Sequence, residues 1–245
     1  MKKRSLAVLL LCTSFFAIRC GKDAAVSSST EAGQNGSLTR FIITGNYLYT
    51  ISNDALKVFD ITNSSAPVYK NIVQVGFAIQ TIFPYQDKLF IGSNTAMYIY
   101  STANPELPKK LSEATYFVRG HDPIVAVDSV AYSTVRNEFG GGVLNCFNIK
   151  DISTPQNVNR VGMTNPYGLG IKDSALYVCE ADSGIKVFTI AKAYTPILKN
   201  QIRFNETAYD VIVKNNILIC YIKGGVSLFD IADLYTPAFI ATVKN

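Results

Sequence analysis

Three cysteines in the body of the chain could form a disulfide, a metal site or a reactive thiol. Cys146, Cys179 and Cys220 each lie in an apolar run, at positions where related segments carry valine, isoleucine or leucine. A cysteine in such a place usually acts as a small buried apolar residue. The single histidine, His121, cannot build a histidine-based zinc site. We therefore expect buried free thiols, no metal site and no cofactor.

Acidic residues offer a second route to chemistry. Glycoside hydrolysis uses two carboxyl groups that flank the scissile bond, roughly 5–9.5 Å apart. The sequence places few acids near the starts of its apolar segments, namely Asp122, Glu206 and Asp210. A glycan-acting hydrolase is therefore an alternative to a non-enzymatic protein, and it requires two of these carboxyl groups to share a cavity.

These residues lie on a repeated framework. Five times an aromatic residue is followed eight positions later by a proline, in the pairs Phe59/Pro67, Tyr100/Pro108, Phe147/Pro155, Phe188/Pro196 and Phe229/Pro237. The aromatic residues stand 41, 47, 41 and 41 positions apart. A period near 40 residues indicates a stacked or radial repeat architecture.

Each repeat contains four short segments rich in β-branched and aromatic residues, separated by glycine, asparagine, aspartate and proline. The third segment carries the aromatic residue, and the fourth begins at the proline, which sheets tolerate at an edge. This pattern predicts an all-β fold, a β-propeller of five four-stranded blades of about 41 residues over 38–245. We expect the first and fifth blades to pack together and close the ring. The alternative is an open arc of five units that dimerises to bury its end faces.

The third segments also resemble a known family. Ala55–Pro67, Gly184–Pro196 and Gly225–Pro237 resemble LVIVD repeats, whose pattern is Gly-Leu-x, two hydrophobic residues, Asp and a hydrophobic residue, then a polar turn and Pro. The resemblance implies a β-propeller of the kind found in bacterial surface and secreted proteins. It implies no shared catalytic residues.

The aspartate of this pattern has a structural role to play in the turn after the strand. Asp60 and Asp230 are expected to accept hydrogen bonds from backbone amides there. In the second and third repeats, Ser101 and Asn148 stand in place of the aspartate.

Residues 1–20 resemble a bacterial lipoprotein signal peptide that ends at Cys20. A basic start precedes 14 mostly apolar residues, a run too short to span a hydrocarbon core of ~30 Å as a helix but suited to a secretory signal. The resemblance implies that Cys20 becomes the lipidated first residue of the exported protein, although Arg19 stands where the motif normally has a small residue. We expect a lipoprotein of a Bacteroidota-like cell envelope, anchored by its lipid to the outer membrane.

The charge of the chain belongs mainly to this segment. Its removal takes four of the 23 basic residues and none of the 18 acidic ones, so the formal charge falls from +5 to about +1. A charge this small gives no reason to expect nucleic acid as a partner. Residues 21–37 are small and polar, and they are expected to form a flexible tether.

Departures from the repeat predict the functional surface. The connection from Ser112 to Pro123 is long, and the third repeat has extra residues between Tyr132 and Phe147, including three consecutive glycines. Both connections should emerge on the same face, because strands alternate in direction. Aromatic and arginine side chains often anchor recognition sites. The expected ligand-binding residues are Tyr116, Phe117, Arg119, His121, Arg136, Glu138 and Phe139.

Two Asp-Ser dipeptides lie in hairpins that would emerge on the opposite face. Asp128-Ser129 and Asp173-Ser174 are typical of tight turns. They also resemble the acceptor pattern for O-glycosylation in exported Bacteroidota proteins, which makes Ser129 and Ser174 candidate modification sites.

The sequence as a whole favours a non-enzymatic cell-envelope lipoprotein that binds a partner through the loop face of a propeller. The partner would be an envelope protein or a glycan. Two alternatives stay open: a glycan-acting hydrolase with carboxylates at the central channel, and a structural component of an envelope assembly.

Overall fold

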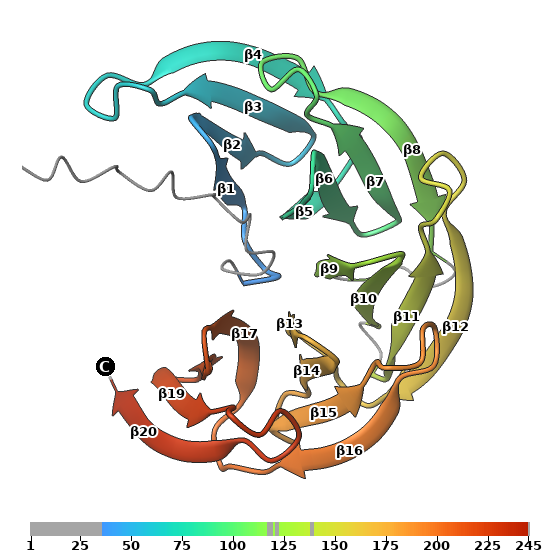
Figure 1. Ribbon diagram of the computed structural model, residues 1–245, viewed down its shortest axis with the longest axis vertical. Helices are drawn as coiled ribbons and strands as arrows, with labels where there is room; N and C mark the ends of the chain where they lie inside the picture. Colours follow the sequence, from blue (N-terminus) through green and yellow to red (C-terminus); the bar gives the residue numbers. More distant parts are fainter. Residues whose placement is uncertain (1–35, 117–119, 121–122, 138–139, 245) are drawn as a thin grey trace, which may run out of the picture. The chain divides into compact units, whose positions relative to one another are not determined.

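The computed structural model describes residues 36–116, 120, 123–137 and 140–244, all within the compact unit Glu31–Asn245. Five antiparallel sheets of four strands follow one another around a centre, which makes this unit a five-bladed β-propeller as the repeats predict (Figure 1). Among the described residues, no helix is long and apolar enough to cross a membrane.

The strands of each blade follow one another from the centre outward (Figure 1). Blade one comprises β1 (Phe41–Thr44), β2 (Tyr47–Ile51), β3 (Ala55–Asp60) and β4 (Val68–Gln74). Blade two comprises β5 (Ile79–Tyr85), β6 (Lys88–Ser93), β7 (Ala96–Ser101) and β8 (Lys109–Thr115). Blade three comprises β9 (Ile124–Val127), β10 (Val130–Arg136), β11 (Gly142–Asn148) and β12 (Gln156–Met163). Blade four comprises β13 (Leu169–Lys172), β14 (Ala175–Cys179), β15 (Ile185–Thr189) and β16 (Ile197–Ile202). Blade five comprises β17 (Ala208–Lys214), β18 (Ile217–Ile222), β19 (Gly225–Asp230) and β20 (Ala238–Lys244).

One turn conformation joins the first two strands of every blade. A single residue in each of these hairpins has a φ between 49° and 57°: Gly45, Gln86, Asp128, Asp173 and Asn215. This left-handed conformation suits glycine, asparagine and aspartate. The two Asp-Ser dipeptides are therefore turns, as expected.

A second repeated turn follows the third strand. The residue after the aromatic one accepts a backbone amide two positions later, at 2.8 Å for Asp60 and Asp230, 3.0 Å for Asn148 and 3.1 Å for Ser101. The predicted role of the two aspartates is thus confirmed, and asparagine and serine perform it equally. All five blades also carry a β-bulge at the aromatic residue itself.

Buried apolar side chains join each blade to the next. They form three clusters, which lie across blades one and two, blades two to four, and blades four and five. Tyrosine hydroxyls add hydrogen bonds across the joints. Tyr49 donates to the Pro105 carbonyl at 2.9 Å, Tyr85 to the Asp128 carbonyl at 3.1 Å, and Tyr177 to the Leu234 carbonyl at 2.8 Å.

The ring is open between the first and fifth blades. No apolar cluster of described residues joins β1–β4 to β17–β20, and the two blades stand apart at the left of the view (Figure 1). The expected closure by packing of blade one on blade five is therefore wrong. The repeat specifies each blade and its contact with the next, but it does not specify the angle between neighbouring sheets on which closure depends. A fully buried aromatic residue of the second strand lies at each of the four joints. These residues are Tyr49, Phe90, Tyr132 and Tyr177.

A short segment before β1 crosses the centre of the arc. The Ser37 hydroxyl donates to Oδ1 of Asp210 at 3.0 Å and accepts the Leu169 amide at 2.7 Å, while the Leu38 amide donates to Oδ2 of Asp210 at 3.2 Å. Ser37 is fully buried. The sequence placed Ser37 in the tether because it is small and polar. Its polar atoms instead join the start of blade one to blades four and five, so ordered structure begins before Leu38.

Candidate functional site

The two connections singled out in the sequence meet on one face of the propeller, here called the loop face. A methyl group on Gly120 would lie only 2.1 Å from the carbonyl oxygen of Arg136, so the two backbones are in close contact. The Gly120 amide also donates to the Asn94 carbonyl at 3.2 Å. Five of the expected ligand-binding residues lie outside the described part of the chain: Phe117, Arg119, His121, Glu138 and Phe139.

Tyr116 packs inward at the base of this face. Its ring meets the ring of Phe147 edge to face, with centroids 6.0 Å apart. Its hydroxyl is buried and has no hydrogen-bond partner within the described part of the chain. Tyr116 therefore contributes to the core that supports the loops.

Arg136 lies at the end of β10 and faces an open pocket of about 580 Å³, here called the loop-face pocket. Its lining residues come from the two connections that follow β10 and β12: Arg136, Asn137, Gly140, Gly141, Thr164, Asn165 and Tyr167. Gly140 and Gly141 have φ values of 92° and 80°, which a larger residue would rarely adopt. The volume lies in the usual range for small-ligand sites.

The Arg136 guanidinium stacks on Tyr167. Its central carbon lies 3.8 Å from the centroid of the Tyr167 ring, a cation–π distance. One guanidinium nitrogen, Nη1, is buried and has no hydrogen-bond partner among the described residues. A planar, charged group with spare donor capacity is thus fixed at the pocket by its aromatic neighbour.

The aromatic surface continues beyond Tyr167 towards the fifth blade. Tyr167 meets Tyr209 edge to face at 5.4 Å, and Tyr209 lies 5.6 Å from Tyr221 in a tilted arrangement. Tyr221 is largely exposed. Three tyrosine rings therefore form a row from the loop-face pocket to the end of the arc.

A buried carboxylate orders the far wall of the pocket. Oε1 of Glu180 accepts the backbone amides of Thr164 and, at 3.1 Å, Asn165. Its Oε2 pairs with the Lys186 ammonium at 2.8 Å. Glu180 is 1% exposed. Glu180 and Tyr167 do not stand out in the sequence, because both lie in regular parts of the repeat. The one feature of the sequence that could have indicated Glu180 is the position of an acidic residue directly after the apolar segment that forms β14.

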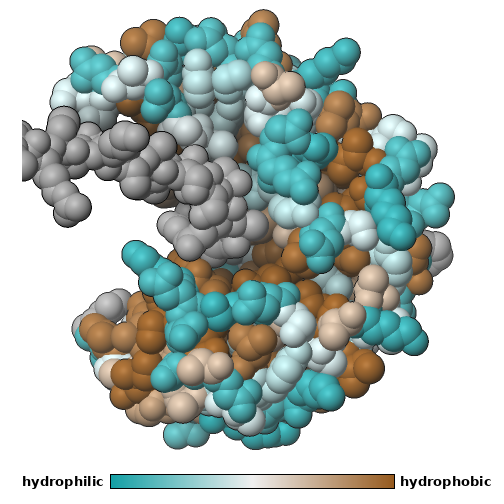
Figure 2. Space-filling view, viewed as in Figure 1, coloured by the Kyte–Doolittle hydropathy of each residue, from teal (hydrophilic) through white to brown (hydrophobic). Residues whose placement is uncertain are grey.

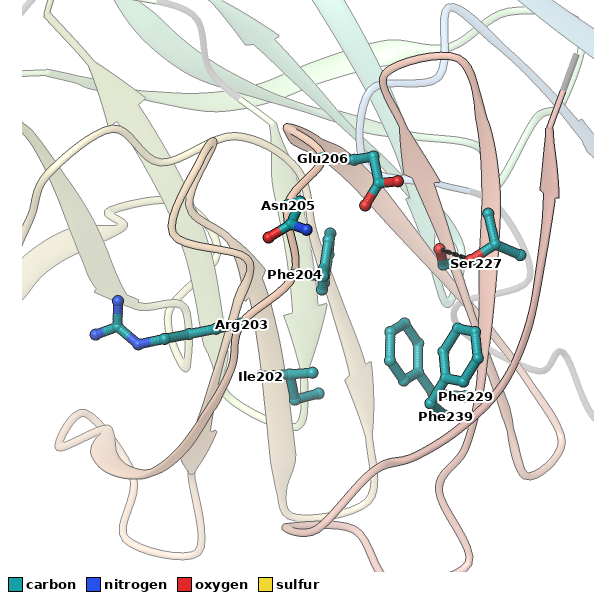
Figure 3. Close-up of a pocket in the computed structure, with 9 residues that line it drawn as sticks. Ile202, Arg203, Phe204, Asn205, Glu206, Ser227, Phe229 and Phe239 are labelled. Carbon is teal, nitrogen blue, oxygen red and sulfur yellow. Dashed lines mark hydrogen bonds between the residues drawn. The ribbon is translucent and has the colours of Figure 1, made fainter.

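A second pocket of about 430 Å³ lies between blades four and five (Figure 3). Phe204 faces Phe229 at 6.0 Å, and Phe229 meets Phe239 edge to face at 5.8 Å. Arg203 points away from these rings (Figure 3). The other lining residues are Ile202, Asn205, Glu206, Ser227 and Thr242. This pocket is mainly an aromatic cluster whose members pack on each other.

The acids proposed for hydrolysis are engaged in other contacts or lie outside the description. Asp122 is not among the described residues. Glu206 pairs with Lys244 at 3.1 Å in the blade four–five pocket. The oxygens of Asp210 are occupied by Ser37 and Leu38 and enclosed by Gly36 and Gly168. This burial raises the pKa of Asp210 to about 6. Of the described residues that line the two pockets, no two in one pocket are carboxylates.

The cysteines are free and buried, as the sequence predicts. Burial raises the pKa of Cys146 to about 12 and raises that of Cys179 as well, so these two thiols are unreactive. Among the described residues, no group of three or more potential ligands could hold a metal ion.

The two candidate glycosylation sites lie on the hairpins opposite the loop face. Ser129 and Ser174 are both partly exposed. The Ser174 hydroxyl shares a hydrogen bond of 2.7 Å with the Tyr235 hydroxyl, which ties this hairpin to blade five.

No protein-family model and no curated protein sequence matches the chain. Solved structures do match, and they show the fold alone because the sequence identities are low. A protein of unknown function from Desulfotomaculum acetoxidans aligns with a TM-score of 0.72 and 13% identity, over 84% of this chain and 69% of its own. The computationally designed Ika8 protein aligns with a TM-score of 0.62 and 13% identity, over 83% of this chain and 60% of its own. Apo AztD from Citrobacter koseri aligns with a TM-score of 0.59 and 10% identity, over 82% of this chain and 60% of its own. The chain thus spans 60–69% of the length of these three proteins.

Proposed function

We propose that this protein is a non-enzymatic binding module that recognises a glycan at the loop-face pocket. The observation that carries the proposal is the stacked pair of Arg136 and Tyr167 at a pocket otherwise lined by amide, hydroxyl and backbone groups. Binding sites often lie on loops that a rigid scaffold holds in place, as the blades hold the connections of the loop face.

The chemistry of the pocket matches a sugar better than an apolar ligand. The electron-rich faces of tyrosine rings attract the weakly positive C–H groups of a pyranose ring. Asn137, Thr164 and Asn165 offer side-chain donors and acceptors for its hydroxyl groups. The row of Tyr167, Tyr209 and Tyr221 provides room for more than one sugar unit. An envelope protein is the alternative partner.

Substitution of Tyr167 tests this assignment. On an array of bacterial envelope polysaccharides and other glycans, Tyr167→Ala should lose about tenfold or more of the affinity of the wild-type protein, because it removes the stacking surface and releases Arg136. The matched control is Phe77→Ala, which removes a 73% exposed aromatic side chain from another loop of the same face. Equal binding by wild type and Tyr167→Ala, or no glycan bound by wild type, would exclude the proposed ligand site.

The location of the protein in the cell is part of the same proposal. The resemblance to LVIVD repeats and to lipoprotein signals supports a bacterial envelope protein whose Cys20 carries the lipid. A Cys20→Ala variant should move from the membrane fraction to the soluble fraction on cell fractionation, because the acyl chains provide the membrane affinity. An unchanged distribution would show that Cys20 is not the anchor.

A glycan hydrolase is the second candidate, and one observation bears on it. Asp210 has a raised pKa near the centre of the arc, as a general acid would. Its contacts with Ser37 and Leu38 favour a structural role instead, and no second carboxylate partner is present among the hydrogen bonds and ion pairs of Asp210.

A further inference from the structure

The loop-face pocket contains a positive charge that has no counter-charge among the described residues around it. Arg136 is the only charged side chain in the described lining, whose other members are amide, hydroxyl, glycine and tyrosine residues. None of the ion pairs between described residues includes Arg136. Glu180, which orders the wall of the pocket, is already paired with Lys186. The described lining therefore attracts a negatively charged group.

The position of Arg136 is costly without a ligand. Its Nη1 is buried and finds no hydrogen-bond acceptor within the described part of the chain. Burial of a charged donor without an acceptor raises the free energy of the folded protein. The contact with Tyr167 offsets only part of this cost, because an aromatic face gives the N–H groups no oxygen to bind. Native proteins rarely leave a buried polar group in this state unless an ion or a ligand completes it.

We propose that the loop-face pocket selects an acidic glycan and that a carboxylate of a uronic acid unit binds Arg136. This inference rests on the proposed function and names the class of sugar that the same site takes. A guanidinium carries a permanent charge and a planar set of N–H donors that match the two oxygens of a carboxylate. Hydrogen bonds between two charged groups of this kind are stronger than those between neutral groups.

The single charge of the described lining favours a carboxylate over a phosphate. A phosphate monoester carries about two negative charges near neutral pH, and one arginine balances only about half of that charge. The pocket also has room for the carboxylate, because Gly140 and Gly141 line it with backbone alone. A methyl group on either glycine would meet no described atom within 4 Å.

The apolar surface that a protein partner would cover lies elsewhere. Apolar side chains gather over blade five at the lower left of the space-filling view, and Phe239 of this blade is 64% exposed (Figure 2). Specific protein interfaces have a well-packed core that is more apolar than its rim. In the described lining of the loop-face pocket, Tyr167 is the only aromatic residue and none is aliphatic. A ligand rich in oxygen therefore fits this pocket better.

Matched pairs of ligands test the charge without any change to the protein. Each pair consists of a uronic acid oligosaccharide, such as oligogalacturonate, and the same oligosaccharide after reduction of its carboxyl groups to alcohols. Isothermal titration calorimetry should show at least one acidic member bound about tenfold or more tightly than its reduced partner. Sulfated galactan oligosaccharides form a third arm, which separates a carboxylate from a sulfate.

Substitution of Arg136 should remove this preference. Arg136→Gln should bind both members of a pair equally, because the charge is lost while a polar side chain remains. Arg136→Lys should lose most of the preference, since lysine keeps the charge but lacks the planar set of donors. The matched control is Arg203→Gln, which removes the same charge from an exposed arginine on the connection between β16 and β17, on the same face. This control should bind as wild type does, and circular dichroism checks that all variants fold.

The possible results separate this inference from the proposed function. Equal affinity of the wild type for both members of every pair would overturn the acidic class and leave glycan binding intact. Binding of the sulfated oligosaccharides alone would overturn the uronic acid. An unchanged preference in Arg136→Gln would overturn the role of Arg136. If the wild type bound no glycan, acidic or neutral, the proposed function itself would fail.

Discussion

Replacement of Glu180 by alanine should lower the free energy of unfolding by about 3–5 kcal/mol, the usual effect of breaking a buried ion pair. The side chain is fully buried, and its removal leaves the Lys186 ammonium, itself only 18% exposed, without its partner. The amides of Thr164 and Asn165 also lose their acceptor. Urea denaturation measures this loss. Because these two residues line the loop-face pocket, glycan binding should weaken in the same variant.

A double variant separates the buried charge from the rest of the effect. Glu180→Gln with Lys186→Met removes both charges and keeps an oxygen that can accept the two amides, so it should recover a large part of the stability lost in Glu180→Ala. A loss below about 1 kcal/mol in Glu180→Ala would place this pair with ordinary surface ion pairs and contradict its role in the pocket.

The second large effect is a dependence of stability on pH that comes from Asp210. Folding raises the pKa of its carboxyl group from the ordinary value of 3.8 to about 6, chiefly by burial. The folded state therefore holds a proton that the unfolded state releases between these values. This contribution to stability is complete below about pH 4 and is lost as the pH rises through about 6. The separation of the two pKa values corresponds to about 3 kcal/mol.

Other carboxyl groups titrate in the opposite sense, so the comparison must be made against a variant. Their pKa values are lowered by hydrogen bonds or ion pairs, as for Asp60, Asp87, Glu106, Asp151 and Asp233. The difference in unfolding free energy between wild type and Asp210→Asn, measured from pH 4 to pH 7, should change by about 3 kcal/mol. Parallel profiles would mean that the Asp210 carboxyl group is solvated in the folded protein.

The blades could be predicted from the sequence because each is specified locally. The aromatic residue, the polar turn and the proline recur at one spacing, and local hydrogen bonds such as that of Asp60 fix the turn within a few residues. Closure of the ring could not be predicted in this way. It depends on the angle between neighbouring sheets, which follows from the packing of buried side chains such as Tyr132 and Tyr177 across each joint. An error in that angle accumulates over five blades.

Only part of the candidate site could be predicted, because the rest again depends on contacts between different blades. The insertion in the third repeat pointed to Arg136, and the structure places it at a pocket. Its partner Tyr167 lies 31 positions further along the chain, in a connection of ordinary length. The burial of Glu180 depends on the course of that same connection. Contacts between separate connections follow from the radial arrangement of the blades, which no local pattern encodes.

Hydroxyl-radical footprinting with the best-binding glycan tests the central claim most directly, because it reports which aromatic side chains a ligand covers. Recognition at the loop-face pocket predicts that oxidation of Tyr167 and Tyr209 falls when the glycan is bound, while oxidation of Phe77 and Phe239 is unchanged. Protection of Phe239 and Phe204 with Tyr167 unaffected would contradict the claim and place the ligand between blades four and five.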